Sequence, residues 1–266
     1  MKGFIKIAFL IFIITGLMGC IETDINIKVS SDGSGTVEET VLMRKDVVQM
    51  IQSMAPPSEQ GKEQEIFPKE DIQKKALQMG EGVTFVSMEK VVTEKFEGYK
   101  AVYAFTDINN LRINENPGKD VPSAPGEETK EELITFQFKK GPTSTLIIRH
   151  PSAKFQKDKP ATQGTVKPED KAQQEIAKEM LKQMFQDMKV SISVEVLGSI
   201  SKTNATHREG SKLTLLELDF NKILESQKSL DEFNKSKPDT METLKTIVKD
   251  LPGIKVELNE VQIEFK

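Results

Sequence analysis

The sequence predicts an α+β fold in which a mainly antiparallel sheet of nine or ten strands is packed by a few amphipathic helices. Segments with alternating apolar and polar residues recur in adjacent pairs, such as 83–92 followed by 96–105. Helical spacing of apolar residues appears in only four or five places and does not separate every pair of strands. This order favours hairpins over βαβ units, and we expect the longest helix to cover the buried face of the sheet.

The predicted strands share alternation or β-branched residues between turn residues. They cover 24–30, 36–43, 83–92, 96–105, 133–138, 145–149, 190–196, 213–220, 254–258 and 261–265. The phase of the alternation slips between the last two segments, which predicts a two-residue turn or a bulge at Asn259-Glu260. The hairpin formed by 83–92 and 96–105 is expected to turn around Glu97-Gly98.

The predicted helices share apolar residues at three- and four-residue spacing. They cover 45–54, 68–79, 168–188, 219–226 and 239–251. In the second helix we expect Ile72, Ala76 and Leu77 to face inward. The helix at 168–188 carries a methionine-rich apolar stripe, which either lines a ligand pocket or, as we favour, packs on the sheet.

Both tyrosines of the chain, Tyr99 and Tyr103, lie on one face of the strand at 96–105 together with Ala101 and Phe105. An aromatic face of this kind either binds a sugar or another ring, or packs in the core. Because the chain has no tryptophan, we favour core packing.

The first twenty residues have the pattern of a secretory signal: two lysines, an unbroken apolar run over 7–14, and small residues before a cut. The apolar run is shorter than the roughly 20 residues that a membrane-spanning helix needs. We therefore predict a signal peptide at 1–19, a mature N-terminus at 20–23 and an α+β body at 24–266. Polar stretches near 107–132 and 151–167 are expected to be flexible insertions.

The signal ends in Leu17-Met18-Gly19-Cys20, and Cys20 is the single cysteine of the chain. This ending resembles the lipobox of bacterial lipoproteins. The resemblance implies cleavage between Gly19 and Cys20, a diacylglyceryl group on the Cys20 thiol and acylation of the new amino terminus. The alternatives are a plain signal peptide with a chance cysteine, or an uncleaved anchor. Few residues separate Cys20 from the first strand, so the body is expected to lie close to the lipid surface.

Removing residues 1–19 leaves 35 basic and 41 acidic residues. This acidic balance argues against nucleic acid as a partner, and against docking on anionic lipid by charge alone. Cys20 is the sole thiol, so the body has no internal disulfide.

Groups suited to catalysis are scarce in this sequence. The two histidines, His150 and His207, lie in different turns without ligand-spaced partners, so we predict no metal site and no cofactor. There is neither a nucleophile elbow nor a phosphate-binding glycine loop. We predict that the protein is not an enzyme and has no catalytic residues; an unrecognised hydrolase built from carboxylates is the third alternative below.

Two further segments carry a second resemblance. The turn Asp32-Gly33-Ser34-Gly35-Thr36 and the block from Val194 to Ile200, with Thr203-Asn204-Ala205 and Gly210 to Leu213, are similar to LppM-type bacterial lipoprotein domains. Leu197 stands where those domains have proline. The resemblance implies a membrane-attached sheet domain that contacts lipid or glycolipid, and it assigns no binding residues.

We therefore predict an exported lipoprotein that is held in the cell envelope through Cys20, on the periplasmic face of the outer membrane if the organism has two membranes. Its expected role is non-catalytic binding of a lipid or another apolar ligand. The alternatives are an interaction with another envelope protein or a structural role, and, third, an unrecognised hydrolase.

Overall fold

The computed structural model describes residues 21–54, 65–114, 133–150, 185–226 and 251–266. The chain forms two compact units. The larger unit comprises Ile21–Pro151, Lys189–Leu218 and Lys255–Lys266, and the smaller one comprises the remaining residues. In the described part of the smaller unit, Asp219 caps helix α5 (Phe220–Glu225), and the rings of Phe185 and Phe220 stack with centroids 5.1 Å apart.

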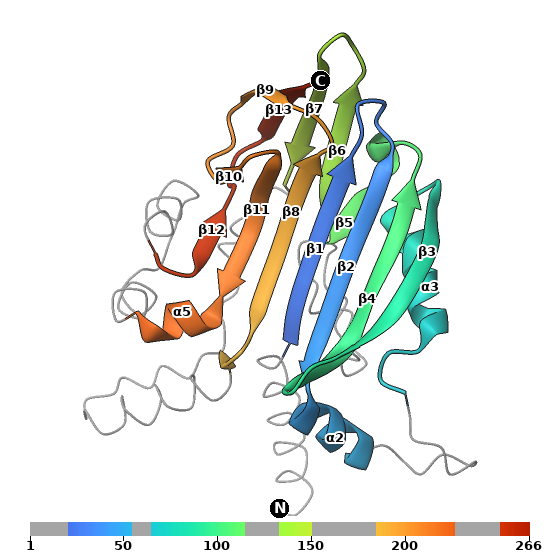
Figure 1. The fold of residues 1–266 in the computed structure, drawn as a ribbon, viewed down its shortest axis with the longest axis vertical. Helices are drawn as coiled ribbons and strands as arrows, with labels where there is room; N and C mark the ends of the chain where they lie inside the picture. Colours follow the sequence, from blue (N-terminus) through green and yellow to red (C-terminus); the bar gives the residue numbers. More distant parts are fainter. Residues whose placement is uncertain (1–20, 55–64, 115–132, 151–184, 227–250) are drawn as a thin grey trace, which may run out of the picture. The chain divides into compact units, whose positions relative to one another are not determined.

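An eight-stranded sheet is the main layer of the larger unit (Figure 1). Its strand order is β10-β11-β8-β1-β2-β4-β3, with β12 pairing to β11. The strands are β1 (Ile21–Val29), β2 (Gly35–Arg44), β3 (Val83–Val92), β4 (Phe96–Phe105), β8 (Lys189–Val196), β10 (Arg208–Glu209), β11 (Lys212–Asp219) and β12 (Ile254–Val256). The sheet is mixed, because β1 pairs antiparallel with β2 but parallel with β8.

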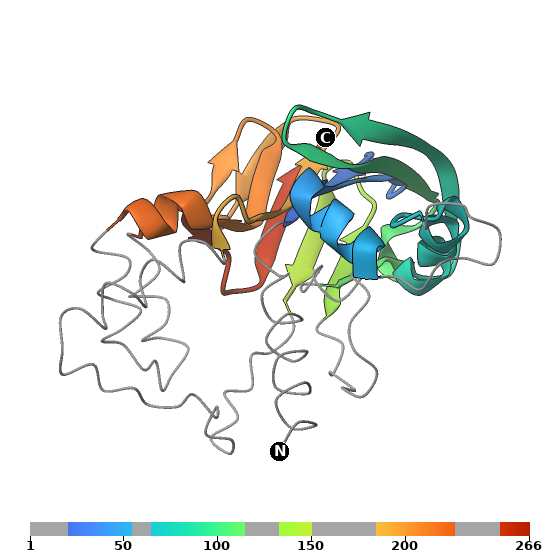
Figure 2. The same cartoon turned by 90° about the horizontal axis from the view of Figure 1, so that it is seen from below.

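A second sheet has five strands in the order β5-β6-β7-β13-β9, and all neighbours are antiparallel. These strands are β5 (Arg112–Asn114), β6 (Leu133–Lys139), β7 (Ser144–Arg149), β9 (Ile200–Thr203) and β13 (Val261–Phe265). Figures 1 and 2 show this sheet and helix α3 on the same side of the eight-stranded sheet. The core of the larger unit lies between them, because the alternate residues of β1, β2, β4 and β8 that point to this side are buried.

Two helices follow directly from sequence signals. Helix α2 (Lys45–Met54) continues from β2 and buries Val47 and Val48. Helix α3 (Lys69–Met79) begins after Pro68 with two acidic residues in its first turn, which suit the positive end of the helix dipole. It ends at Gly80, whose φ of 129° disfavours any residue with a side chain. A short 3₁₀ turn, η2 (Ile108–Asn110), precedes β5.

The prediction of one mainly antiparallel sheet of nine or ten strands was wrong, although the α+β character was correct. The phase slip near Asn259-Glu260 marks neither a hairpin turn nor a bulge. Strand β12 belongs to the eight-stranded sheet and β13 to the five-stranded one, so the chain changes sheets there. A change of sheet resets the inward phase, which explains the slip.

Three local predictions also need correction. Leu77 is 81% exposed, and Met79 is buried in its place. The β3–β4 hairpin turns at Thr93–Phe96, where the Thr93 N–H donates to the Phe96 carbonyl, and Gly98 lies inside β4. The predicted insertion at 107–132 includes η2 and β5. The remainder of that insertion, the insertion at 151–167, the methionine-rich helix up to residue 184 and the helix at 239–250 lie outside the described residues.

Candidate functional site

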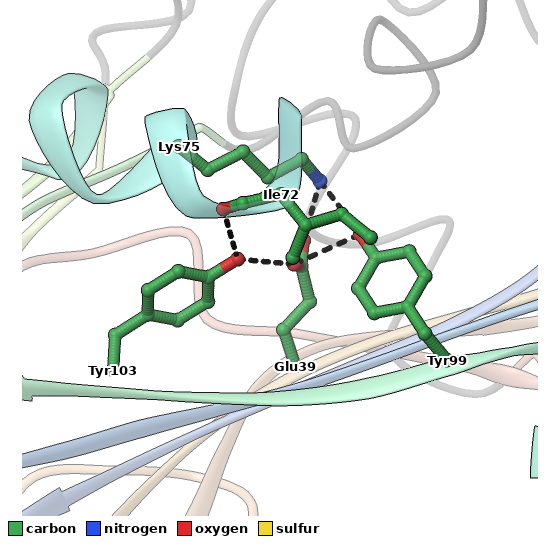
Figure 3. Close-up of polar contacts among 5 residues, drawn as sticks. All are labelled: Glu39, Ile72, Lys75, Tyr99 and Tyr103. Carbon is green, nitrogen blue, oxygen red and sulfur yellow. Dashed lines mark hydrogen bonds and ion pairs between the residues drawn. The ribbon is translucent and has the colours of Figure 1, made fainter. Parts of the chain in front are cut away.

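A carboxylate side chain lies inside the core of the larger unit. Glu39 occupies an inward position of β2, between Val37 and Val41, and is only 2% exposed. A buried carboxylate is costly unless it is paired and hydrogen-bonded. The partners of Glu39 come from β4 and α3, and Figure 3 shows them converging on it from both sides.

Helix α3 supplies the cation, and β4 supplies two phenols. The Lys75 Nζ lies 2.9 Å from Glu39 Oε1 and also donates to the Tyr99 hydroxyl at 2.9 Å. The Tyr99 hydroxyl in turn donates to Glu39 Oε2 at 3.0 Å. The Tyr103 hydroxyl lies 3.4 Å from the same carboxylate oxygen and 3.0 Å from the Ile72 carbonyl of α3. Every polar group of this cluster therefore has a partner.

Strand register explains why these residues meet. Glu39 pairs with Ala101, so Tyr99 and Tyr103 lie two residues on either side of its direct partner and on the same face. Helix α3 packs over that face, and its residues three apart present Ile72 and Lys75 to the cluster. The cluster thus joins α3 to the centre of the sheet.

The environment of Tyr103 suppresses its ionisation. Burial raises the pKa of Tyr103 above its ordinary value, and the negative charge of Glu39 adds to the effect. The Tyr103 hydroxyl therefore remains a hydrogen-bond donor rather than a base. The predicted core role of the aromatic face is confirmed, because Tyr99, Ala101, Tyr103 and Phe105 are all buried.

A pocket of about 210 Å³ lies beside this cluster. Its lining residues are Gln52, Glu65, Ile66, Phe67, Met88, Lys90, Glu97 and Gly98. The Phe67 ring meets Tyr99 edge-on, with centroids 5.4 Å apart, so one lining residue touches the buried cluster. The volume is below the roughly 300 Å³ at which small-molecule sites begin.

The outer face of the eight-stranded sheet carries paired charges. Lys28 on β1 bonds Glu38 on β2 at 2.6 Å, and Lys100 on β4 lies 3.8 Å from the same carboxylate. The hydrogen bond from Lys28 lowers the pKa of Glu38, and the same bond raises the pKa of Lys28. Figures 1 and 2 show no described helix or strand of the larger unit over this face.

The candidate histidines are not brought into a site. His150 follows β7, whereas His207 precedes β10, and these strands belong to different sheets. The backbone N–H groups of Thr206 and His207 both donate to the buried carboxylate of Glu257, at 2.5 Å and 2.8 Å, and these bonds fix the turn. Among the described residues, no three Asp, Glu, His or Cys side chains gather in a way that would hold a metal ion.

Gly19 and Cys20, the predicted cleavage and lipid-attachment residues, lie outside the described residues. Strand β1, however, begins at Ile21, directly after Cys20 and three residues earlier than predicted. In the described part of the chain, no helix is both long and apolar enough to cross a membrane.

Sequence reasoning missed Glu39 and Lys75. The signal for Glu39 was a charged residue at an inward-facing position of an alternating strand.

No protein-family model and no curated protein sequence matches this chain. A search of solved structures finds the folded domain of LppM from Mycobacterium tuberculosis, with a TM-score of 0.33 and 10% identity, over 93% of this chain and 90% of that one. A TM-score of this size does not establish a common fold.

Proposed function

We propose that this protein is an exported, non-catalytic binding module of a bacterial cell envelope, anchored by lipid on Cys20. The observation that carries the proposal is the position of β1. Its first residue is Ile21, and it lies between β2 and β8 within the larger sheet. Cleavage before Cys20 would remove no residue of β1, and Ile21 would become the second residue of the mature chain.

Acyl chains on Cys20 would supply the attachment. Each buried methylene contributes about 0.8 kcal/mol, and two or more chains are needed for stable anchoring. The residues around the buried carboxylate support a non-catalytic role, since Lys75, Tyr99 and Tyr103 use their polar groups on one another and on Glu39. Their arrangement fits a structural link between α3 and the sheet.

The proposed ligand is a lipid or another apolar molecule. The sequence feature behind this proposal is the pocket-lining alternative for the methionine-rich stripe at 168–188, since thioethers adapt to irregular apolar ligands. A second candidate, an envelope protein as partner, is favoured by the outer face of the eight-stranded sheet, which no described element of the larger unit covers.

Detergent partitioning tests the anchor. Protein made with its signal in a bacterial host should enter the detergent-rich phase of a phase-separating detergent. Residues 20–266 with Cys20→Ala, made without the signal, should remain in the aqueous phase. Ser53→Ala, a change at an exposed position of α2, is the matched control and should partition like the wild type. Equal partitioning of the wild type and Cys20→Ala would contradict the proposal.

Extraction of the purified Cys20→Ala protein with organic solvent tests the ligand, because this variant carries no covalent lipid. Mass spectrometry should detect a lipid at close to one equivalent. If no lipid is present, the apolar-ligand proposal fails and the protein-partner alternative is favoured.

A further inference from the structure

We infer that the end of the eight-stranded sheet where β1 begins faces the phospholipid headgroups, with α2 and the β3–β4 turn lying against the bilayer surface. This inference rests on the proposed function, since it takes Cys20 as the anchor. It adds which surface of the body meets the membrane and which surface points away from it.

The connection between Cys20 and the folded body is short. One peptide bond joins Cys20 to Ile21, and consecutive Cα atoms are about 3.8 Å apart. Ile21 is already held in the sheet, because it pairs with Met43 of β2 and is buried. No flexible tether therefore separates the anchor from the folded body, and the start of β1 must stay within a few ångströms of the lipid.

Helix α2 and the β3–β4 turn lie at this end of the sheet (Figure 1). Strand β2 ends at Arg44, one residue after the partner of Ile21, and α2 begins at Lys45. The Lys45 N–H donates to the Lys95 carbonyl in the β3–β4 turn at 3.0 Å. Figure 1 shows α2 and this turn together at the end where β1 starts. We call this set, Ile21 with Lys45–Met54 and Val92–Phe96, the anchor-end surface.

The composition of the anchor-end surface suits contact with headgroups. Among its described side chains it exposes two apolar ones, Met50 at 40% and Val92 at 55%. Its charges are mixed, since Lys45 and Asp46 lie in the first turn of α2 and Glu94 and Lys95 lie in the β3–β4 turn. Because the signs are balanced, the anchor and not an attraction to anionic lipid sets the orientation.

The opposite end of the sheet provides the reference point. The Leu197 N–H donates to the carbonyl of Val29, the last residue of β1, and the Leu197 side chain is 53% exposed. The nine residues of β1 span about 26 Å at ~3.3 Å per residue. Leu197 is therefore expected to stand well above the headgroup layer.

Site-specific quenching tests the orientation. Met50→Cys, Val92→Cys and Leu197→Cys would each be made in the full protein with its signal, so that acylated Cys20 does not compete for the thiol-reactive fluorophore. Each labelled protein would be reconstituted in phosphatidylcholine vesicles with and without a headgroup-attached nitroxide lipid. Quenching should be several-fold stronger at positions 50 and 92 than at 197, and circular dichroism would confirm that each variant is folded.

Equal quenching at the three positions, or stronger quenching at 197, would overturn the inference. Quenching at position 50 that appears only after phosphatidylglycerol is added would overturn it too, because charge would then set the orientation. Vesicle flotation separates the two proposals. A protein that fails to float contradicts the proposed anchor and the inference with it, whereas a protein that floats without quenching at 50 and 92 contradicts the orientation alone.

Discussion

The buried link between α3 and the sheet predicts a large effect from a single substitution. Lys75→Met removes the cation that lies 2.9 Å from Glu39 Oε1 and leaves the carboxylate with only phenol donors. Breaking a buried ion pair by removing one partner costs about 3–5 kcal/mol. The Lys75 side chain is 15% exposed, so we expect the lower end, about 3 kcal/mol. The total free energy of unfolding of a native domain is about 5–15 kcal/mol.

Urea unfolding measures this loss, and the chain provides its own probe. Tyr99 and Tyr103 are its only tyrosines, and it has no tryptophan, so intrinsic fluorescence reports on the cluster itself. Far-ultraviolet circular dichroism follows the sheets in the same samples. For a protein of this size, a loss of about 3 kcal/mol lowers the thermal midpoint by about 6–12 °C.

A matched control lies one residue away in α3. Lys74 pairs with Asp71 on the surface, where ion pairs contribute little, so Lys74→Met should leave the urea midpoint unchanged. Glu39→Gln combined with Lys75→Met should cost less than the sum of the single changes, because each single change leaves a partner unmatched. Additive single effects, or a Lys75→Met midpoint equal to that of the wild type, would refute the role given to this cluster.

Three further predictions follow from other contacts. Gly98→Ala should prevent soluble folding, because its Cβ would lie 1.9 Å from the Val41 carbonyl oxygen; recovery of soluble protein with wild-type dichroism would contradict this. The folded-state pKa of Glu38 is lowered, so its ion pair with Lys28 stabilises the fold above about pH 4.5, and this stabilisation is lost as the pH falls below that value. In Lys28→Met, the thermal midpoint should therefore fall less steeply between neutral and acidic pH than in the wild type. Asp219→Ala should lower the stability of α5 by about 1 kcal/mol, because it removes the side-chain oxygen that accepts from the Lys222 backbone N–H. Amide hydrogen exchange of α5 measures this loss, and unchanged exchange would argue against the cap.

Local patterns predicted much of the secondary structure. The alternation in Val83–Val92 and Phe96–Phe105 gave both strands their observed bounds, and the apolar spacing did the same for the helix Lys45–Met54. The apolar spacing within each of these elements is enough to identify it, whichever distant segment it packs against. Leu77 was misplaced because it is adjacent to the true inward stripe of Ile72, Ala76 and Met79.

Pairing between distant segments was beyond local patterns. Ile25 pairs with Ile192 in parallel, and nothing in either strand distinguishes this partner from the next hairpin along the chain. The change of sheet after β12 produced a visible phase slip, but the same slip is typical of a bulge. Glu39 could have been noticed as a charge in an inward phase, whereas Lys75 on a charged helix gave no comparable signal.

The intact mass of the protein extracted from bacterial membranes tests the central proposal most directly. We predict a chain that begins at Cys20 and carries a thioether-linked glycerol with two fatty acyl chains, with or without a third acyl chain on its amino terminus. A mass that retains residues 1–19, or a chain beginning at Cys20 with an unmodified thiol, would contradict the anchor and the membrane orientation inferred from β1.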